Sequence, residues 1–320
     1  MRIRGVIEGF YGAPWSHEER LDLIRFCGTE GLNTWVHAPK DDPYHRARWR
    51  ELYPEEELAR FAELAAEAAQ NGVDFAYAIA PGLDLDYADD GELATVLAKL
   101  DQLRPAGIQS FQLLWDDIES RAGAEQAAFS NRVAHELGSL VVCPVGYAGT
   151  EDTKYRRAFG PALDDSIVVY WTGPEVVSFA IAREELDAAA RRFANHELLL
   201  WDNYPVNDFA PQTLFLGPLR GRDPRLAGGR CAGIVANAML QAVPSKLALA
   251  TVADWSRDPD AYDALASFER ALGRYGAEVL DALGAEPAEV EPPDDLAALV
   301  DALAFGVDAS TAVALLRPFV

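Results

Sequence analysis

Two aspartates stand side by side at the end of an apolar run, in the segment LLWDDIES that spans residues 113–120. Asp116 and Asp117 repel each other there, so the pair is either a solvated turn or a place where chemistry needs two carboxyls. Of two close carboxyls, one can be ionised while the other keeps its proton, which provides a charged stabiliser beside a proton donor. The pair is therefore a candidate for acid–base chemistry.

An isolated Asp-Asp pair is more often a turn or a helix cap than a catalytic dyad. The chain contains a second such pair, Asp41-Asp42, and the proline that follows it is typical of a turn. Only the surroundings of Asp116 and Asp117 can distinguish the two pairs.

Polar and aromatic residues follow almost every apolar run of the chain. They are 8–12, 39–46, 116–117, Tyr147, 171–173, 201–203, 207–208 and Asn237. Carboxylates and amides bond hydroxyl groups, and indole rings can stack on the apolar faces of sugars, so together these residues suit a carbohydrate pocket. Taken one at a time, Trp171 and Trp201 are more simply explained as core and Lys40 as a surface lysine. The functional interpretation depends on their occurrence at successive strand ends.

Eight short apolar runs would form these strands, and helical patterns separate most of them. The runs are 3–8, 34–38, 74–80, 110–115, 140–144, 167–171, 197–201 and 233–236. Their near-continuous hydrophobicity is typical of strands that are buried on both faces. A first helix after Ser16 is indicated by an S-x-x-E capping box that ends at Glu19. The weakest helices are expected at 155–165 and 214–229, where Gly and Pro interrupt the pattern.

Eight strand–helix units in about 250 residues predict a (β/α)8 barrel, whose active site lies at the carboxyl ends of the strands. An open doubly wound sheet is the alternative, but it would more often carry a phosphate-binding glycine fingerprint after the first strand. We expect the barrel to span residues 1–275. A helical appendage is expected over 276–320, where helical stretches are interrupted by Pro292-Pro293.

Composition excludes several classes of partner and chemistry. The chain carries 28 basic and 51 acidic residues, a net charge of −23, so neither nucleic acid nor an anionic membrane is an expected partner. The five histidines show no metal-ligand spacing and no nucleotide-binding motif is present, so no metal or cofactor is expected. The amino terminus lacks the apolar core of a signal peptide, which predicts a cytoplasmic protein. The oligomeric state is left open.

Several of these motifs together resemble glycoside hydrolase family 84, the family of O-GlcNAcases and related β-N-acetylglucosaminidases and hyaluronidases. The resemblance rests on RGVIEGFYGAPWS (4–16), HAPKDDPYHR (37–46), LLWDDI (113–118), YWTGP (170–174), WDNYPVND (201–208) and VAN (235–237). It covers the whole expected barrel in order. It implies a retaining hydrolase that removes terminal β-linked N-acetylglucosamine and uses the substrate's own acetamido group as the nucleophile.

The resemblance also implies roles for individual residues. Asp116 would orient the acetamido group, and Asp117 would be the general acid/base. The substrate-binding residues would be Gly9 and Lys40 at a sugar hydroxyl, Tyr147, Trp201 and Asn203 around the acetamido group, Asp208 and Asn237 at the outer hydroxyls, and Tyr11 in the pocket lining. The expected partner is a glycan or glycoprotein that bears N-acetylglucosamine.

Two alternatives remain open from the sequence. The barrel could bind N-acetylglucosamine like a lectin with little turnover, although both carboxylates are present. It could also perform the same chemistry on hyaluronan-type or bacterial glycans.

Overall fold

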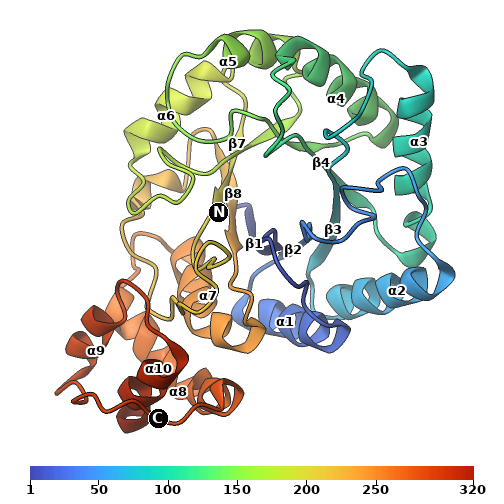
Figure 1. The fold of residues 1–320 in the computed structure, drawn as a ribbon. Coiled ribbons are helices and arrows are strands. Elements are labelled where there is room, and N and C mark those ends of the chain that lie inside the picture. The colour runs from blue at the N-terminus through green and yellow to red at the C-terminus, as the bar shows by residue number, and fades with distance from the viewer.

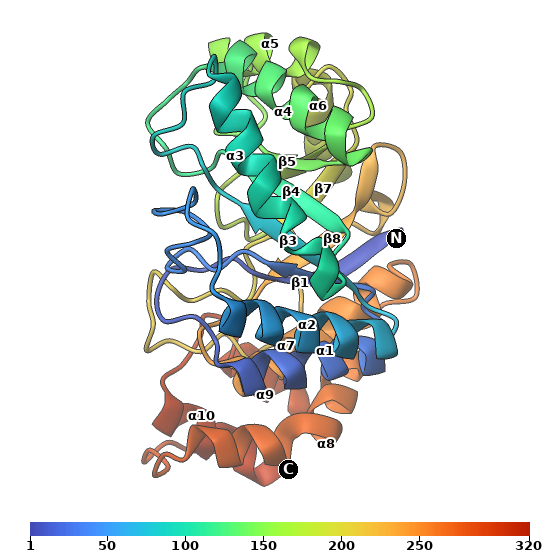
Figure 2. The ribbon, with the colours of Figure 1, turned by 90° about the vertical axis from the view of Figure 1, so that its right-hand side faces the viewer.

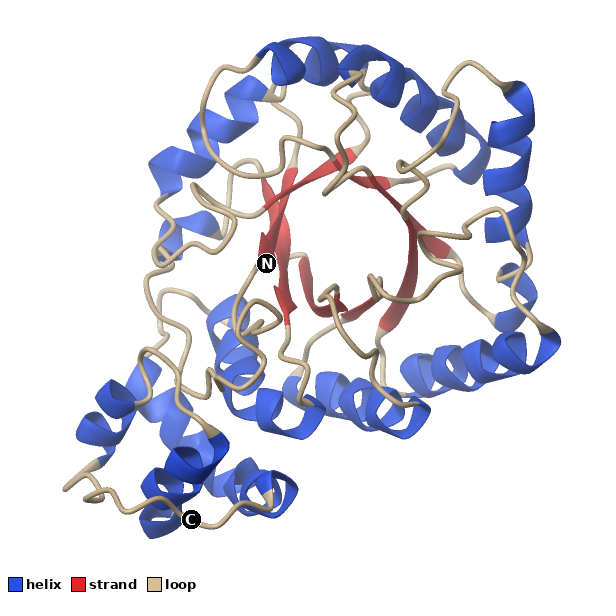
Figure 3. Cartoon of the chain, in the orientation of Figure 1, coloured by secondary structure: helices blue, strands red, loops and turns tan.

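The computed structural model describes residues 1–320, and its centre is a closed barrel of eight parallel strands (Figure 1). The strands pair in chain order and β8 pairs with β1 (Figure 3). They are β1 Ile3–Glu8, β2 Thr34–His37, β3 Asp74–Ile79, β4 Ser110–Leu114, β5 Val141–Cys143, β6 Val168–Trp171, β7 Leu198–Asp202 and β8 Cys231–Asn237. The predicted (β/α)8 barrel is confirmed, and the open sheet is excluded.

Helices surround the barrel and bury the outer faces of its strands (Figure 3). They are α1 His17–Glu30, α2 Glu55–Gln70, α3 Asp90–Asp101, α4 Gly123–Leu137, α5 Lys154–Phe159, α6 Arg183–Arg192 and α7 Ala242–Arg257. Ser16 caps α1 with the predicted capping box, because its hydroxyl accepts from the Glu19 N–H while the Glu19 carboxylate accepts from the Ser16 N–H.

The weak helix expected at 214–229 does not form. Only a 3₁₀ turn at Pro224–Leu226 lies between β7 and β8. The reason is local, since Pro218 and Pro224 each lack a backbone N–H donor and Gly221 adopts a φ of 73°. This segment instead runs as a long loop from the carboxyl end of β7 to the amino end of β8, and it contacts α7 through a 2.9 Å hydrogen bond from the Leu219 N–H to the Thr251 hydroxyl.

The barrel interior is filled by side chains from alternate strand positions. Ile7, Val36, Leu114, Leu199 and Val235 belong to this inner cluster. Within this interior Tyr170 donates a 2.8 Å hydrogen bond to the Gln112 side chain, so the buried polar pair is satisfied. The packed interior separates the two ends of the barrel, and in this fold the active site lies at the carboxyl ends of the strands.

The carboxyl-terminal helices lie against one side of the barrel, next to α7 (Figure 1 and Figure 2). They are α8 Ala264–Leu283, α9 Leu296–Ala302 and α10 Ala309–Leu316. Residue 276, where the appendage is expected to begin, lies within α8, whose apolar face packs on α7 through residues such as Phe268 and Leu272. A bridge between Leu214 and Val307 joins the segment before α10 to the loop after β7. The division at 275/276 remains a prediction.

The structure also describes the three cysteines and the apolar character of the helices. Cys27 and Cys143 are buried and unpaired, and Cys231 is partly buried and unpaired. No helix combines the length and the apolar character that crossing a membrane requires.

Candidate active site

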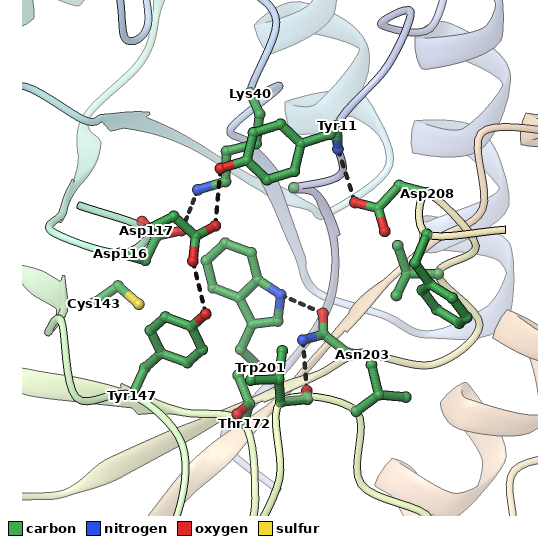
Figure 4. Close-up of a pocket in the computed structure, with 15 residues that line it drawn as sticks. Tyr11, Lys40, Asp116, Asp117, Cys143, Tyr147, Thr172, Trp201, Asn203 and Asp208 are labelled. Atoms are coloured by element: carbon green, nitrogen blue, oxygen red, sulfur yellow. Dashed lines mark hydrogen bonds and ion pairs between the residues drawn. The ribbon is translucent and has the colours of Figure 1, made fainter. Parts of the chain in front are cut away.

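A cavity of about 290 Å³ opens at the carboxyl ends of the strands (Figure 4). Nine of the ten residues expected in the site line it: Gly9, Tyr11, Lys40, Asp116, Asp117, Tyr147, Trp201, Asn203 and Asp208. They lie at or after the carboxyl ends of five different strands, and the closed barrel brings them together. The tenth, Asn237, lies directly behind the lining.

Asp116 is the buried member of the aspartate pair, with 5% of its surface exposed. Its Oδ2 forms an ion pair with Lys40 Nζ, which also lies 5.3 Å from the centroid of the Trp201 ring. Its Oδ1 has no hydrogen-bond partner in the protein although it is buried. An unpartnered buried carboxylate oxygen costs free energy, so this atom is suited to accept an N–H or O–H from a bound molecule.

Asp117 is the exposed member, and its backbone turns away from the strand. Its φ of 54° lies in the left-handed region, which Asp and Asn adopt more readily than other residues with a side chain. The turn separates the two neighbouring carboxylates, so that one is held in the floor of the pocket and the other in its wall (Figure 4).

Two tyrosines hold the Asp117 carboxylate, one on each oxygen. Tyr11 donates to Oδ2 at 2.9 Å and Tyr147 donates to Oδ1 at 2.7 Å (Figure 4). Burial, reinforced by the Asp117 carboxylate, raises the pKa of both phenols above its usual value. Both hydroxyls therefore remain donors, and they fix the direction in which Asp117 points.

Arg46 supports the same residue from behind, and sequence reasoning assigned it no role. Its Nη2 donates to the Asp117 backbone carbonyl at 2.9 Å, and its guanidinium lies 5.8 Å from the centroid of the Tyr11 ring. Arg46 is largely buried, and its Nη1 has no protein partner. Its position at the end of the motif HAPKDDPYHR associates Arg46 with the site, but its contact with the Asp117 carbonyl depends on the fold of the loop after β2.

Trp201 and Asn203 form the opposite wall through a chain of amide contacts. Trp201 Nε1 donates to Asn203 Oδ1 at 3.0 Å, and Asn203 Nδ2 donates to the Val176 carbonyl at 2.8 Å. Asn237 Nδ2 also donates to Asn203 Oδ1, at 3.0 Å, while Asn237 Oδ1 accepts from the Gly9 N–H at 3.1 Å. Asn237 thus fixes Gly9 and Asn203 through the two ends of its amide.

Gly9 lies so close to the indole that no larger residue fits. A Cβ at this position would lie 2.5 Å from Trp201 Cζ2. The glycine therefore allows the β1 end and the Trp201 ring to meet at the floor of the pocket.

Thr172, from the polar strand end 171–173, also lines the cavity as the sequence analysis expects. Sequence reasoning did not single out the remaining lining residues: Cys143, Val176, Val177, Val206 and Phe209. Cys143 lies at the end of β5, and burial keeps the pKa of its thiol well above its usual value. Apolar side chains give no chemical signal in a sequence, so their place in the lining follows only from the loop conformations.

Comparisons with known proteins agree with this geometry. Residues 4–285 match the family model described as β-N-acetylglucosaminidase. The rat and mouse proteins named Protein O-GlcNAcase are each 36% identical over 271 residues, which cover 78% of this chain and 29% of theirs. This chain therefore spans less than a third of the length of these relatives.

Solved structures show the same similarity. A variant of the Thermobaculum terrenum O-GlcNAc hydrolase superposes with a TM-score of 0.83 at 35% identity, covering 89% of this chain and 65% of that one. The protein named CpGH84B also gives 0.83, at 36% identity, with 88% and 54% covered.

Proposed function

This chain belongs to glycoside hydrolase family 84, the β-N-acetylglucosaminidase family, and from that premise we propose that it removes terminal β-linked N-acetylglucosamine with retention of configuration. The observation that carries the proposal is the contrast within the aspartate pair. Asp116 is buried beside Lys40 with one oxygen unpartnered, whereas Asp117 is exposed at the mouth of the same cavity.

We propose that Asp116 acts on the 2-acetamido group of the substrate. Its free Oδ1 accepts the acetamido N–H, which turns the carbonyl oxygen toward the anomeric carbon and increases the electron density on that oxygen. The carbonyl oxygen attacks this carbon, the glycosidic bond breaks, and a cyclic oxazoline-type intermediate forms. The Asp116 carboxylate then faces the positive charge that develops on the ring.

Asp117 is proposed to move the proton in both steps. It first donates a proton to the glycosidic oxygen as this leaves, and then removes a proton from the water that opens the intermediate. Two successive inversions at the anomeric carbon give overall retention. Tyr11 and Tyr147 both donate to the Asp117 carboxylate, and the hydrogen bond to the oxygen that carries the proton weakens when Asp117 is in its acid form.

The positions of the two aspartates argue against a nucleophile from the protein. A retaining enzyme with two catalytic carboxyls places them about 5–5.5 Å apart on opposite faces of the sugar. Asp116 and Asp117 are consecutive residues at the end of one strand and reach the sugar from one side. Attack by the substrate itself needs no second carboxylate, and a well-oriented internal nucleophile has an effective molarity on the order of 10⁵–10⁸ M.

The remaining site residues are proposed to bind the sugar as the family resemblance implies. Gly9 and Lys40 would bind a ring hydroxyl, Asp208 and Asn237 the outer hydroxyls, and Tyr147, Trp201 and Asn203 the acetamido group, with Tyr11 in the lining. The Asn237 amide has a second N–H and a second oxygen lone pair, so its contacts with Gly9 and Asn203 leave capacity for a sugar hydroxyl.

Turnover of an aryl N-acetyl-β-glucosaminide tests the proposal directly. We expect hydrolysis whose first-formed sugar product is the β-anomer, detected by NMR. Formation of the α-anomer would refute retention. Tight binding of the sugar with no turnover would instead favour a lectin-like barrel, for which no feature of the site provides a reason.

A further inference from the structure

The main chain that carries Asp117 is held by a single hydrogen bond. The segment stays paired with β5 as far as Trp115, whose N–H donates to the Cys143 carbonyl at 2.8 Å. Beyond this point no backbone group of residues 116–120 bonds another backbone group. The one hydrogen bond to this stretch comes from Arg46, whose Nη2 donates to the Asp117 carbonyl at 2.9 Å. Asp117 has the left-handed φ of 54°, a conformation that persists only where the surrounding structure holds it.

Arg46 also contacts a tyrosine that bonds the Asp117 carboxylate. Its guanidinium lies 5.8 Å from the centroid of the Tyr11 ring, a distance at which a cation is attracted to the ring face. The Tyr11 hydroxyl in turn donates to Asp117 Oδ2 at 2.9 Å. Arg46 therefore contacts both the peptide group that follows Asp117 and the ring whose hydroxyl fixes its carboxylate.

The preceding residue, His45, fixes the position from which Arg46 reaches Asp117. His45 is buried, its Nδ1 donates to the Ala78 carbonyl at 2.7 Å, and its own carbonyl accepts from the Ala80 N–H at 3.0 Å. Ala78 lies in β3 and Ala80 follows the end of that strand. Arg46 thus connects a rigid strand end to a stretch of main chain that has no such support.

Packing alone does not explain an arginine at position 46. Only 9% of its surface is exposed, and its side chain forms no ion pair, although the chain carries 51 acidic residues. Its Nη1 has no protein partner. A buried cation without a carboxylate destabilises the folded state relative to an apolar side chain of similar volume. A residue that lowers stability in this way beside a catalytic group indicates a function there.

We propose that Arg46 is a positioning residue for the proton donor, and that it directs the Asp117 carboxyl at the glycosidic oxygen by holding the Asp117 main chain and the Tyr11 ring. The inference rests on the proposed hydrolase function. Arg46 does not line the cavity, so it acts through these two residues and not on the sugar. A proton donor must lie within hydrogen-bond reach of its acceptor, and a displacement of about 1 Å can cost about 10²-fold in rate. Arg46 should therefore matter only where the leaving oxygen needs a proton.

The test compares two aryl substrates in the R46M variant, which loses the donors and the charge and keeps an unbranched side chain. For phenyl N-acetyl-β-glucosaminide, whose leaving group needs a proton, we expect R46M to lower kcat/KM by about 10- to 100-fold. For the dinitrophenyl glycoside, whose leaving group departs as a stable anion, the loss should stay below about threefold. Equal losses on the two substrates would overturn the inference.

The same substitution in a D117N background shows whether Arg46 acts through Asp117. Two residues that act as a unit have non-additive effects. R46M should therefore lower kcat/KM for the phenyl glycoside by less than about twofold once Asp117 has been replaced by asparagine. A loss of the same size in both backgrounds would indicate a general structural role and would overturn the positioning role.

R4M is the matched control. The Arg4 side chain also donates only to backbone carbonyls, those of Met1 and Gly31, and it lies in β1 at the opposite end of the barrel. R4M removes the same charge and should keep the wild-type ratio of the two aryl rates. If R4M lowered this ratio as R46M does, loss of one positive charge would be a sufficient cause and the inference would be wrong.

Urea unfolding distinguishes positioning from support of the fold. Because an unpaired buried cation is removed, R46M should unfold at the wild-type urea midpoint or above it. A lower midpoint combined with equal losses on both substrates would assign Arg46 to the fold and overturn the inference. R46K, which keeps the buried charge, takes the place of R46M in both comparisons if R46M does not fold. No turnover of either substrate by the wild-type protein would overturn the proposed function itself, whereas wild-type turnover with equal R46M losses would overturn only the role of Arg46.

Discussion

Replacing Asp117 by asparagine should separate substrates according to their leaving groups. The side chain keeps its size, and asparagine tolerates the left-handed φ of 54°. One tyrosine hydroxyl would then face an amide NH₂ in place of a carboxylate oxygen, and it can rotate to accept from that group. Because Asp117 is exposed, we expect a change in unfolding free energy of about 1 kcal/mol or less.

The catalytic loss should be large only where the leaving oxygen needs a proton. For a GlcNAc-serine peptide, D117N should reduce kcat/KM about 10²–10⁴-fold, equivalent to about 2.7–5.5 kcal/mol of transition-state stabilisation. For a nitrophenyl glucosaminide, whose leaving group departs as a stable anion, we expect a loss below about tenfold.

The quantity to compare is kcat/KM, since it reports the steps up to and including the first irreversible one. The base role of Asp117 in the second step then affects kcat without obscuring the comparison. Equal losses on both substrates would refute the assignment of Asp117 as the acid.

Three other substitutions test the remaining parts of the site. D116N should slow the hydrolysis of every substrate whatever its leaving group, and rates equal to wild type would argue against acetamido participation. It should also lower the unfolding free energy, measured in urea, by about 3–5 kcal/mol, because Lys40 loses its buried partner. G9A should raise KM for all substrates, since its Cβ would lie 2.5 Å from the Trp201 indole, and wild-type kinetics would contradict that packing. His45 is buried, which lowers its pKa to about 3, so the unfolded chain binds a proton near pH 6.5 that the folded chain does not. The free energy of unfolding therefore decreases as the pH drops below about 6.5. H45Q should reduce the slope of unfolding free energy against pH by about 1.4 kcal/mol per pH unit, measured in urea titrations. Parallel slopes for H45Q and wild type would contradict the lowered pKa of His45.

Much of the barrel can be predicted because strands buried on both faces have a distinctive pattern. The run 3–8 coincides with β1, and the run 74–80 exceeds β3 by one residue. The segment between β7 and β8 follows a different rule, since its prolines and Gly221 determine its local backbone. Strand periodicity contains no information about such a loop.

Some features of the site can likewise be predicted from the sequence and others cannot. Asp116 and Asp117 can be predicted from their place at the end of an apolar run, because strand ends converge at one face of a barrel. The contacts of Arg46 and Asn237 cannot be predicted from the sequence, because they depend on where a loop and a neighbouring strand end lie in three dimensions. The larger hollow of about 900 Å³ beside the cavity could not be predicted, because its lining depends on how the loops before α4 and α5 fold against each other.

The left-handed backbone at Asp117 limits what this position can become in evolution. Glycine, asparagine and aspartate adopt that conformation most readily, whereas a glutamate at this position would carry the same acid at a backbone cost of about 1–2 kcal/mol. A single nucleotide change converts an aspartate codon to an asparagine codon. The shortest mutational route from this site therefore leads from the proposed hydrolase to a protein with the same pocket that turns over only substrates with activated leaving groups, and reversal is equally short.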